Sequence, residues 1–269
     1  MTQIGSLSYA IPPAVAAASG IIIIAIVMKW APASPSRRLF VVMVTGLVLW
    51  GMTILGMRVT SDLNAAVVWD QLAAVAIMVM FLGFYHFSVL YTNTPGQRKA
   101  LAVGYALVAV YGISTPFGGL VEGLRVEDYG YAPIPGVMAA PAMVTAVALL
   151  LAGVRTLVRR YKMTSSIEER NRLLYLVAGA CLPLVGTVLD IVTNLPPVGI
   201  WTNILFCGIS AVALLEYHLL DIPQVARRTL TYLVLGVMVA LPYVLTLLVL
   251  QRLFGARLES FWGYLVTVL

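Results

Sequence analysis

Charged residues are scarce in this sequence. Asp, Glu, Lys and Arg make up 10% of its 269 residues, whereas apolar and aromatic residues make up 61%. Charged residues make up about 25% of a typical water-soluble domain, mostly on its surface. This composition therefore excludes an ordinary soluble enzyme or binding domain, and it indicates a membrane protein.

The sequence also lacks residues for cofactor binding or catalysis at the positions where membrane proteins would need them. The lysines Lys29, Lys99 and Lys162 lie at or beyond the ends of apolar runs, so none can hold retinal as a Schiff base in mid-span. Two histidines and two isolated cysteines form no haem pair or zinc-binding pattern. Neither a GxSxG motif nor a phosphate-binding loop occurs. The sequence predicts no catalytic residue, no cofactor and no metal site in this segment.

Long apolar runs are what the sequence has instead. A helix that crosses a bilayer needs about 20 mostly apolar residues. By that length, the fold class is an all-α, polytopic transmembrane helix bundle of eight or nine spans. The predicted spans lie near 9–30, 39–58, 66–91, 100–118, 137–158, 173–193, 199–218 and 229–250, with a ninth that begins at Phe261.

The basic residues predict the orientation of these spans. Of the 17 Lys and Arg residues, most fall in the connections after spans one, three, five and seven. The opposite connections hold only Arg58, Arg125, Arg252 and Arg257. Because Lys and Arg are enriched on the cytoplasmic side, the amino terminus is expected outside. The net charge of +6 lies in clusters beside apolar runs, which favours contacts with anionic lipid and argues against nucleic acid as a partner.

Several polar and aromatic residues lie near the outer ends of the predicted spans. We expect them to line an outward-facing cup that binds a small cationic or hydrogen-bonding ligand. The candidate ligand-binding residues are Asp70, Asp190, Trp69, Trp201, Arg58, Tyr129 and Tyr131. Two other interpretations stay open. Asp70 could begin a helix and complement its dipole, or Arg58 could form a structural ion pair with either carboxylate.

Three stretches of the chain resemble a known family. They are residues 69–92, which open with Trp-Asp and close in Phe-Tyr-His-Phe-Ser-Val-Leu-Tyr-Thr; residues 167–192, in which a polar stretch leads into span six; and residues 216–243, with Tyr-His-Leu-Leu-Asp-Ile before an arginine pair. These stretches resemble the amino-terminal seven-transmembrane region of bacterial sensor histidine kinases. The resemblance covers residues 1–220, taken as a seven-helix sensor-like domain. Residues 221–269 are taken as a joint plus additional transmembrane helices, before an output domain beyond Leu269.

The joint has a local physical explanation. Asp221 can cap a new helix, and Pro223 can occupy its first turn, where a missing N–H costs nothing. Arg227 and Arg228 would hold the helix start at the anionic inner leaflet. The resemblance makes these four residues candidates for signal transmission to the next span. An ordinary loop with positive-inside charges is the alternative.

The resemblance implies a module in the bacterial inner membrane that senses a signal and drives a cytoplasmic output, in a full-length protein that could be a histidine kinase. Its expected partners are membrane lipids, an unidentified small ligand, and either a second copy joined through the kinase output or other membrane subunits. A non-catalytic structural subunit of a larger membrane complex is the main alternative. A small-solute transporter is less favoured, because the sequence shows no convincing internal repeat.

Overall fold

The computed structural model describes residues 7–127, 130–192 and 199–216. Seven long helices lie within this part of the chain, together with a short 3₁₀ turn and one β-hairpin. In chain order the elements are α1 (Leu7–Trp30), α2 (Pro35–Val59), α3 (Leu63–Tyr91), α4 (Arg98–Ser114), the 3₁₀ turn η1 (Thr115–Phe117), β1 (Val121–Glu127), β2 (Gly130–Pro135), α5 (Ala139–Met163), α6 (Ile167–Val192) and α7 (Gly199–Glu216).

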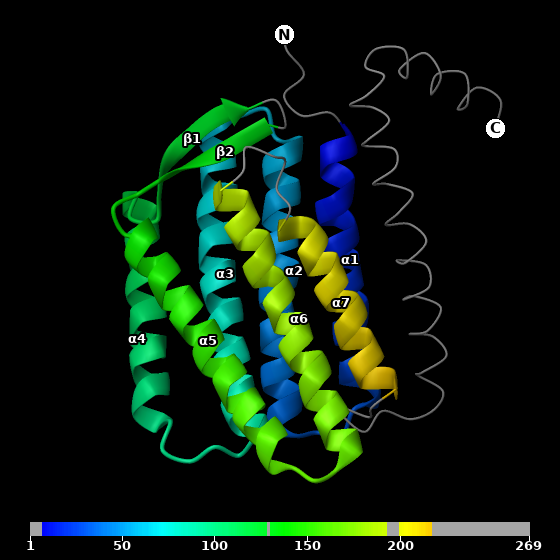
Figure 1. Cartoon of the computed structure of the whole chain (residues 1–269). Coiled ribbons are helices and arrows are strands. Elements are labelled where there is room, and N and C mark those ends of the chain that lie inside the picture. Colours follow the sequence, from blue (N-terminus) through cyan, green and yellow to red (C-terminus); the bar gives the residue numbers. More distant parts are fainter. Residues whose placement is uncertain (1–6, 128–129, 193–198, 217–269) are drawn as a thin grey trace, which may run out of the picture.

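The helices form one bundle with two chemically distinct ends (Figure 1). The connections α1–α2, α3–α4 and α5–α6 lie at one end, which we call the basic end because Lys29, Arg98, Lys99 and Arg160 are there. The α2–α3 connection and the β-hairpin lie at the other, the hairpin end. The segregation follows from the sequence, since basic residues flank alternate apolar runs.

The β-hairpin corrects the expectation of an all-α fold, since it forms the connection between the fourth and fifth predicted spans. Strands β1 and β2 pair antiparallel, with Leu124 opposite Pro133 and Glu127 opposite Gly130. Val126 and Tyr131 are residue types that favour strands, and a glycine at position 130 favours a tight turn. The paired strands satisfy backbone groups of a segment that is too polar to enter the bilayer.

The predicted spans correspond closely to the described helices. Five helical stretches are long and apolar enough to cross a membrane: Tyr9–Trp30, Pro35–Val59, Leu63–Tyr91, Arg98–Phe117 and Ala139–Met163. Helices α6 and α7 pack in the same bundle, and the apolar stretch Gly199–Ser210 of α7 is shorter. The eighth and ninth predicted spans lie outside the described residues.

The core is divided between the middle of the bundle and the hairpin end. The larger cluster joins α1–α7 and includes Phe40 and Phe87, whose rings meet edge to face at 5.8 Å between centroids. The smaller cluster joins residues of α1, α2, α3 and α7 to Tyr131 of the hairpin. The hairpin is therefore part of the packed structure and not a loop that projects from it.

Candidate functional site

The polar residues at the hairpin end are held together by Arg58. This last-turn residue of α2 is only 7% exposed. Its guanidinium Nη1 donates a hydrogen bond of 3.1 Å to the backbone carbonyl of Tyr131. The Tyr131 hydroxyl in turn donates to the carbonyl of Ser61 at 3.3 Å. These two bonds attach strand β2 to the end of α2 and to the α2–α3 connection, so that the hairpin covers this end of both helices.

Asp70 lies beneath this cover, well inside helix α3. The helix begins at Leu63, and its N-cap is Asp62, whose carboxylate accepts from the backbone N–H groups of Asn64 and Ala65 at 3.1 and 3.3 Å. The idea that Asp70 begins the helix is therefore wrong, because Asp62 has that role. Sequence reasoning missed Asp62, although an aspartate just before an apolar helical run is a recognised N-cap signal.

The Asp70 side chain is buried and incompletely satisfied. The residue is 6% exposed, and its Oδ2 atom has no hydrogen-bond partner among the residues that the structure describes. Arg58 is the charge that attracts it electrostatically. A buried carboxylate oxygen without a donor is costly, and a proton, a hydrogen-bond donor or a small cation would remove that cost.

The surroundings of Asp70 are apolar and come from several elements. Asp70 lies one helical turn after Ala66 and one turn before Ala73, and both alanines belong to the smaller core cluster. Tyr131 and Trp201 pack into the same cluster from the hairpin and from α7. The structure thus brings four of the predicted residues to one region: Arg58, Asp70, Tyr131 and Trp201. It buries the polar ones under the hairpin instead of exposing them in an open cup.

Trp69 lies on a different face of α3. It is 37% exposed, and its ring covers Gly56 of α2, where a Cβ atom would approach the ring to 2.6 Å. Asp190 is near the end of α6, but its side chain is outside the described structure, as is Tyr129. The joint residues Asp221, Pro223, Arg227 and Arg228 also lie outside it.

Two further features lie away from the hairpin end. His86 of α3 shares a 2.8 Å hydrogen bond with the Tyr105 hydroxyl of α4, so this histidine has a packing partner. Tyr105 was not predicted as that partner, because spacing along one helix does not identify contacts to another.

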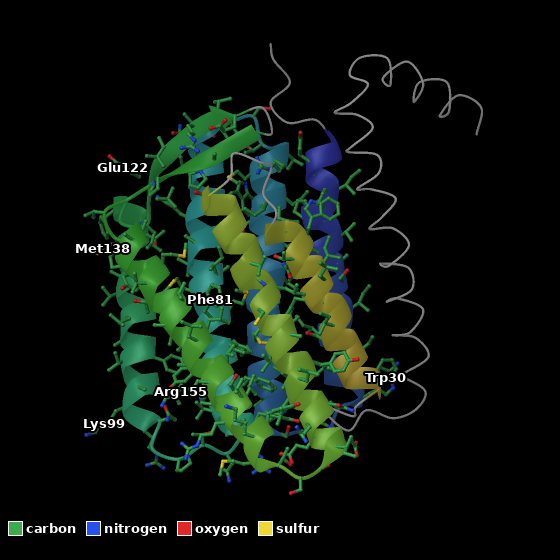
Figure 2. The ribbon with its side chains drawn as sticks, in the orientation of Figure 1. Trp30, Phe81, Lys99, Glu122, Met138 and Arg155 are labelled. Carbon is green, nitrogen blue, oxygen red and sulfur yellow. The ribbon has the colours of Figure 1, made fainter. Side chains whose placement is uncertain are left out.

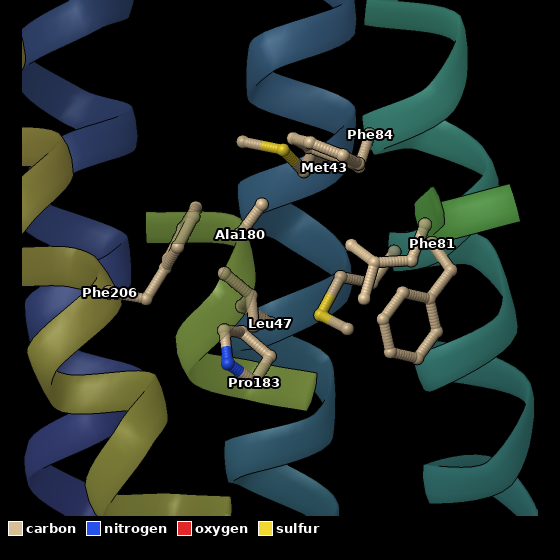
Figure 3. Close-up of a pocket in the computed structure, with 9 residues that line it drawn as sticks. Met43, Leu47, Phe81, Phe84, Ala180, Pro183 and Phe206 are labelled. Carbon is tan, nitrogen blue, oxygen red and sulfur yellow. The ribbon is translucent and has the colours of Figure 1, made fainter. Parts of the chain in front are cut away.

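An apolar pocket lies between α2, α3, α5, α6 and α7 (Figure 3). Its volume is about 20 Å³, and it is lined by Met43, Leu47, Met80, Phe81, Phe84, Leu150, Ala180, Pro183 and Phe206. Typical ligand pockets measure roughly 300–1,000 Å³ and carry a few polar groups. This pocket is therefore a small packing gap, and Asp70 is the better candidate for ligand contact. Within the described residues, no group of three or more His, Cys, Asp or Glu could hold a metal.

The comparisons with known proteins identify the family. Residues 13–223 match the N-terminal 7TM region of histidine kinase, and this range takes in nearly all of the seven described helices. The chain belongs to this family of membrane-embedded sensor regions. The searches of curated proteins and of solved structures found no match.

Proposed function

We propose that this chain is the signal-sensing module of a sensor histidine kinase-like receptor. The hairpin end faces the outside of a bacterial inner membrane, and the basic end faces the cytoplasm. A change at the hairpin end passes through the helices and the 221–228 joint to a cytoplasmic output beyond Leu269. The family match and the predominance of Lys and Arg in the connections at one end support this proposal.

The observation that carries the proposal is the buried Asp70 oxygen without a donor. A carboxylate that served only as a structural ion-pair member would be expected to have both oxygens satisfied. Asp70 instead has an unsatisfied oxygen beneath the hairpin, to which Arg58 and Tyr131 contribute hydrogen bonds. A ligand that donates a hydrogen bond to Asp70, or places a positive charge beside it, would weaken the electrostatic attraction between Asp70 and Arg58. Because Arg58 also binds strand β2, this change would shift the hairpin.

The test compares two carboxylate-to-amide variants in the full-length protein. Asp70→Asn removes the buried charge with little change of shape, whereas Asp62→Asn makes the same change at an exposed N-cap, a position at which asparagine also caps well. We expect Asp70→Asn to alter autophosphorylation of the output region at normal abundance and thermal stability. Asp62→Asn is expected to leave autophosphorylation unchanged.

Three outcomes oppose the proposal. A less stable Asp70→Asn protein with normal autophosphorylation would make Asp70 a structural partner of Arg58. Unchanged autophosphorylation and unchanged stability would exclude Asp70 from the site. A reading frame that encodes no kinase output after Leu269 would favour the structural-subunit alternative.

A further inference from the structure

Helix α5 presents an apolar stripe that ends in two arginines. Val144 and Leu151 are exposed, and Arg155 and Arg159 continue the same face at helical spacing toward the basic end. The opposite face of α5 is buried through residues such as Ala146, Leu150 and Leu157. The stripe therefore faces the bilayer, and its arginines occupy the end of the bundle where lipid headgroups begin.

Arg155 is the unusual member of this stripe. It lies about two turns, or roughly 12 Å, before the end of α5, within a stretch apolar enough to cross the membrane. Within the described residues, the structure assigns the Arg155 guanidinium no hydrogen bond, ion pair or ring contact, in contrast to Arg160, which bonds to Glu169 at 2.7 Å. A guanidinium this far before the helix end is costly unless its long side chain extends to water or to the charged headgroups at the interface.

Helix α4 contributes a second cation, Lys99, at the same end of the bundle as Arg155. The two helices contact each other at Gly104 and Leu149, and through a 3.0 Å hydrogen bond between the hydroxyls of Tyr111 and Thr145. Toward the basic end the ribbons of α4 and α5 diverge (Figure 1). Figure 2 shows Lys99 and Arg155 at this end, on the side of the bundle formed by α4 and α5. Lys99 is exposed.

We propose that the α4–α5 face binds one anionic phospholipid, with its phosphate at Arg155, an acyl chain along Val144 and Leu151, and Lys99 adding positive charge at the same end of the bundle. A guanidinium binds phosphate through two parallel N–H···O bonds, whereas a zwitterionic headgroup offers a less favourable charge. The apolar stripe that continues from Arg155 along α5 matches an acyl chain, and neither free phosphate nor a soluble acidic partner would use it. This proposal does not depend on the sensor function.

Native mass spectrometry of the purified full chain tests the site. Phosphatidylglycerol and phosphatidylcholine are titrated separately, and the dissociation constant of the first bound lipid is measured. We expect phosphatidylglycerol to bind more tightly, and Arg155→Gln to weaken its binding about fivefold, the effect of one basic residue near a membrane surface. Arg155→Lys should retain most of the affinity. Phosphatidylcholine binding should not change.

The matched control is Arg38→Gln, which removes an exposed cation at the same end of the bundle but on α2. This variant should leave the dissociation constant of the first bound phosphatidylglycerol unchanged. If Arg38→Gln and Arg155→Gln weakened phosphatidylglycerol binding equally, the effect would come from overall charge, and the proposal of a specific site would be wrong. Equal binding of the two lipids by the unmodified chain would also overturn it, and free phosphate that competes with phosphatidylglycerol would show that the stripe plays no part.

Discussion

At the scale of single residues, the hairpin end depends on a close approach between Gly130 and Arg58. Gly130 has a φ angle of +116°, a conformation that residues with a Cβ atom rarely adopt. A Cβ at this position would also lie 2.7 Å from the Arg58 Nη1 atom. Glycine here therefore permits both the turn and the hydrogen bond from Arg58 to Tyr131.

Gly130→Ala is expected to destabilise the protein by about 1 kcal/mol or more, because the new methyl group meets both backbone strain and the buried guanidinium. Gly123→Ala in strand β1 is the matched control, since its Cβ would meet only the Ile134 Cδ1 atom, at an ordinary 3.8 Å. Thermal unfolding in detergent gives the melting temperature of each variant. Similar melting temperatures for the two variants would show that Gly130 is not required for the attachment of the hairpin.

The sequence predicted some site residues and missed others for physical reasons. Arg58 and Asp70 stand out because charges near apolar spans are rare. Their burial could not be predicted, because it depends on a hairpin that folds back from a distant part of the chain. Trp69 and Asp70 are neighbours in sequence, yet adjacent residues on a helix point in different directions. Trp69 consequently packs on Gly56, and Asp70 faces the smaller core cluster.

At the scale of elements, the α5–α6 corner is joined by polar contacts around Glu169. Its carboxylate accepts hydrogen bonds from Thr164 and from Arg160, and its backbone N–H donates to the Ser166 hydroxyl at 3.3 Å. Arg170 also stacks on the Tyr161 ring, 4.8 Å from its centroid. These contacts fix the angle between α5 and α6 at the basic end, ahead of the predicted sixth span.

The hydrogen bonds from Thr164 and Arg160 lower the pKa of Glu169 from its ordinary value of 4.5. Because the folded pKa is below the unfolded one, the stabilisation is fully present above the unfolded value and is lost as the pH falls through the folded value. We expect the melting temperature of Glu169→Gln to fall less than that of the unmodified chain as the pH is lowered from about 6 to about 3, a range that extends below the ordinary pKa of this carboxyl. The fall in melting temperature of Thr164→Val over the same pH range should lie between those of Glu169→Gln and the unmodified chain. An equally steep fall in Glu169→Gln would exclude this carboxylate as a source of acid sensitivity.

The elements themselves were largely predictable where hydrophobicity defined them. The predicted start of span seven at residue 199 agrees with α7, and the predicted end of span one at residue 30 agrees with α1. The hairpin was missed because residues 121–135 are short and polar, and two paired strands produce a weaker signal than a long apolar run. Helix α6 begins at Ile167, before the apolar run, because its first turns are stabilised at the corner and not by lipid.

At the scale of the whole molecule, close contacts between helices make the bundle a connected unit. Gly46 of α2 faces the Met80 backbone of α3, and Gly83 of α3 faces the Met43 backbone of α2. A Cβ atom added at either glycine would lie only 3.1 to 3.3 Å from that backbone. Such approaches favour van der Waals packing between helices in a bilayer. The sequence indicated the number of helices in this region, but the helix pairs could be identified only from the folded structure.

The orientation of the whole molecule is testable with two single cysteines on a Cys181→Ser background, in which the remaining Cys207 is buried. Val126→Cys places a thiol on the hairpin, at a residue that is 65% exposed, and Ser165→Cys places one in the exposed α5–α6 connection at the basic end. Because basic connections remain in the cytoplasm, a membrane-impermeant maleimide should label Val126→Cys in intact cells and Ser165→Cys only after the membrane is disrupted. The background protein without an added cysteine measures unspecific labelling. Labelling of Ser165→Cys in intact cells, with Val126→Cys protected, would reverse the topology and place the Asp70 region on the cytoplasmic side.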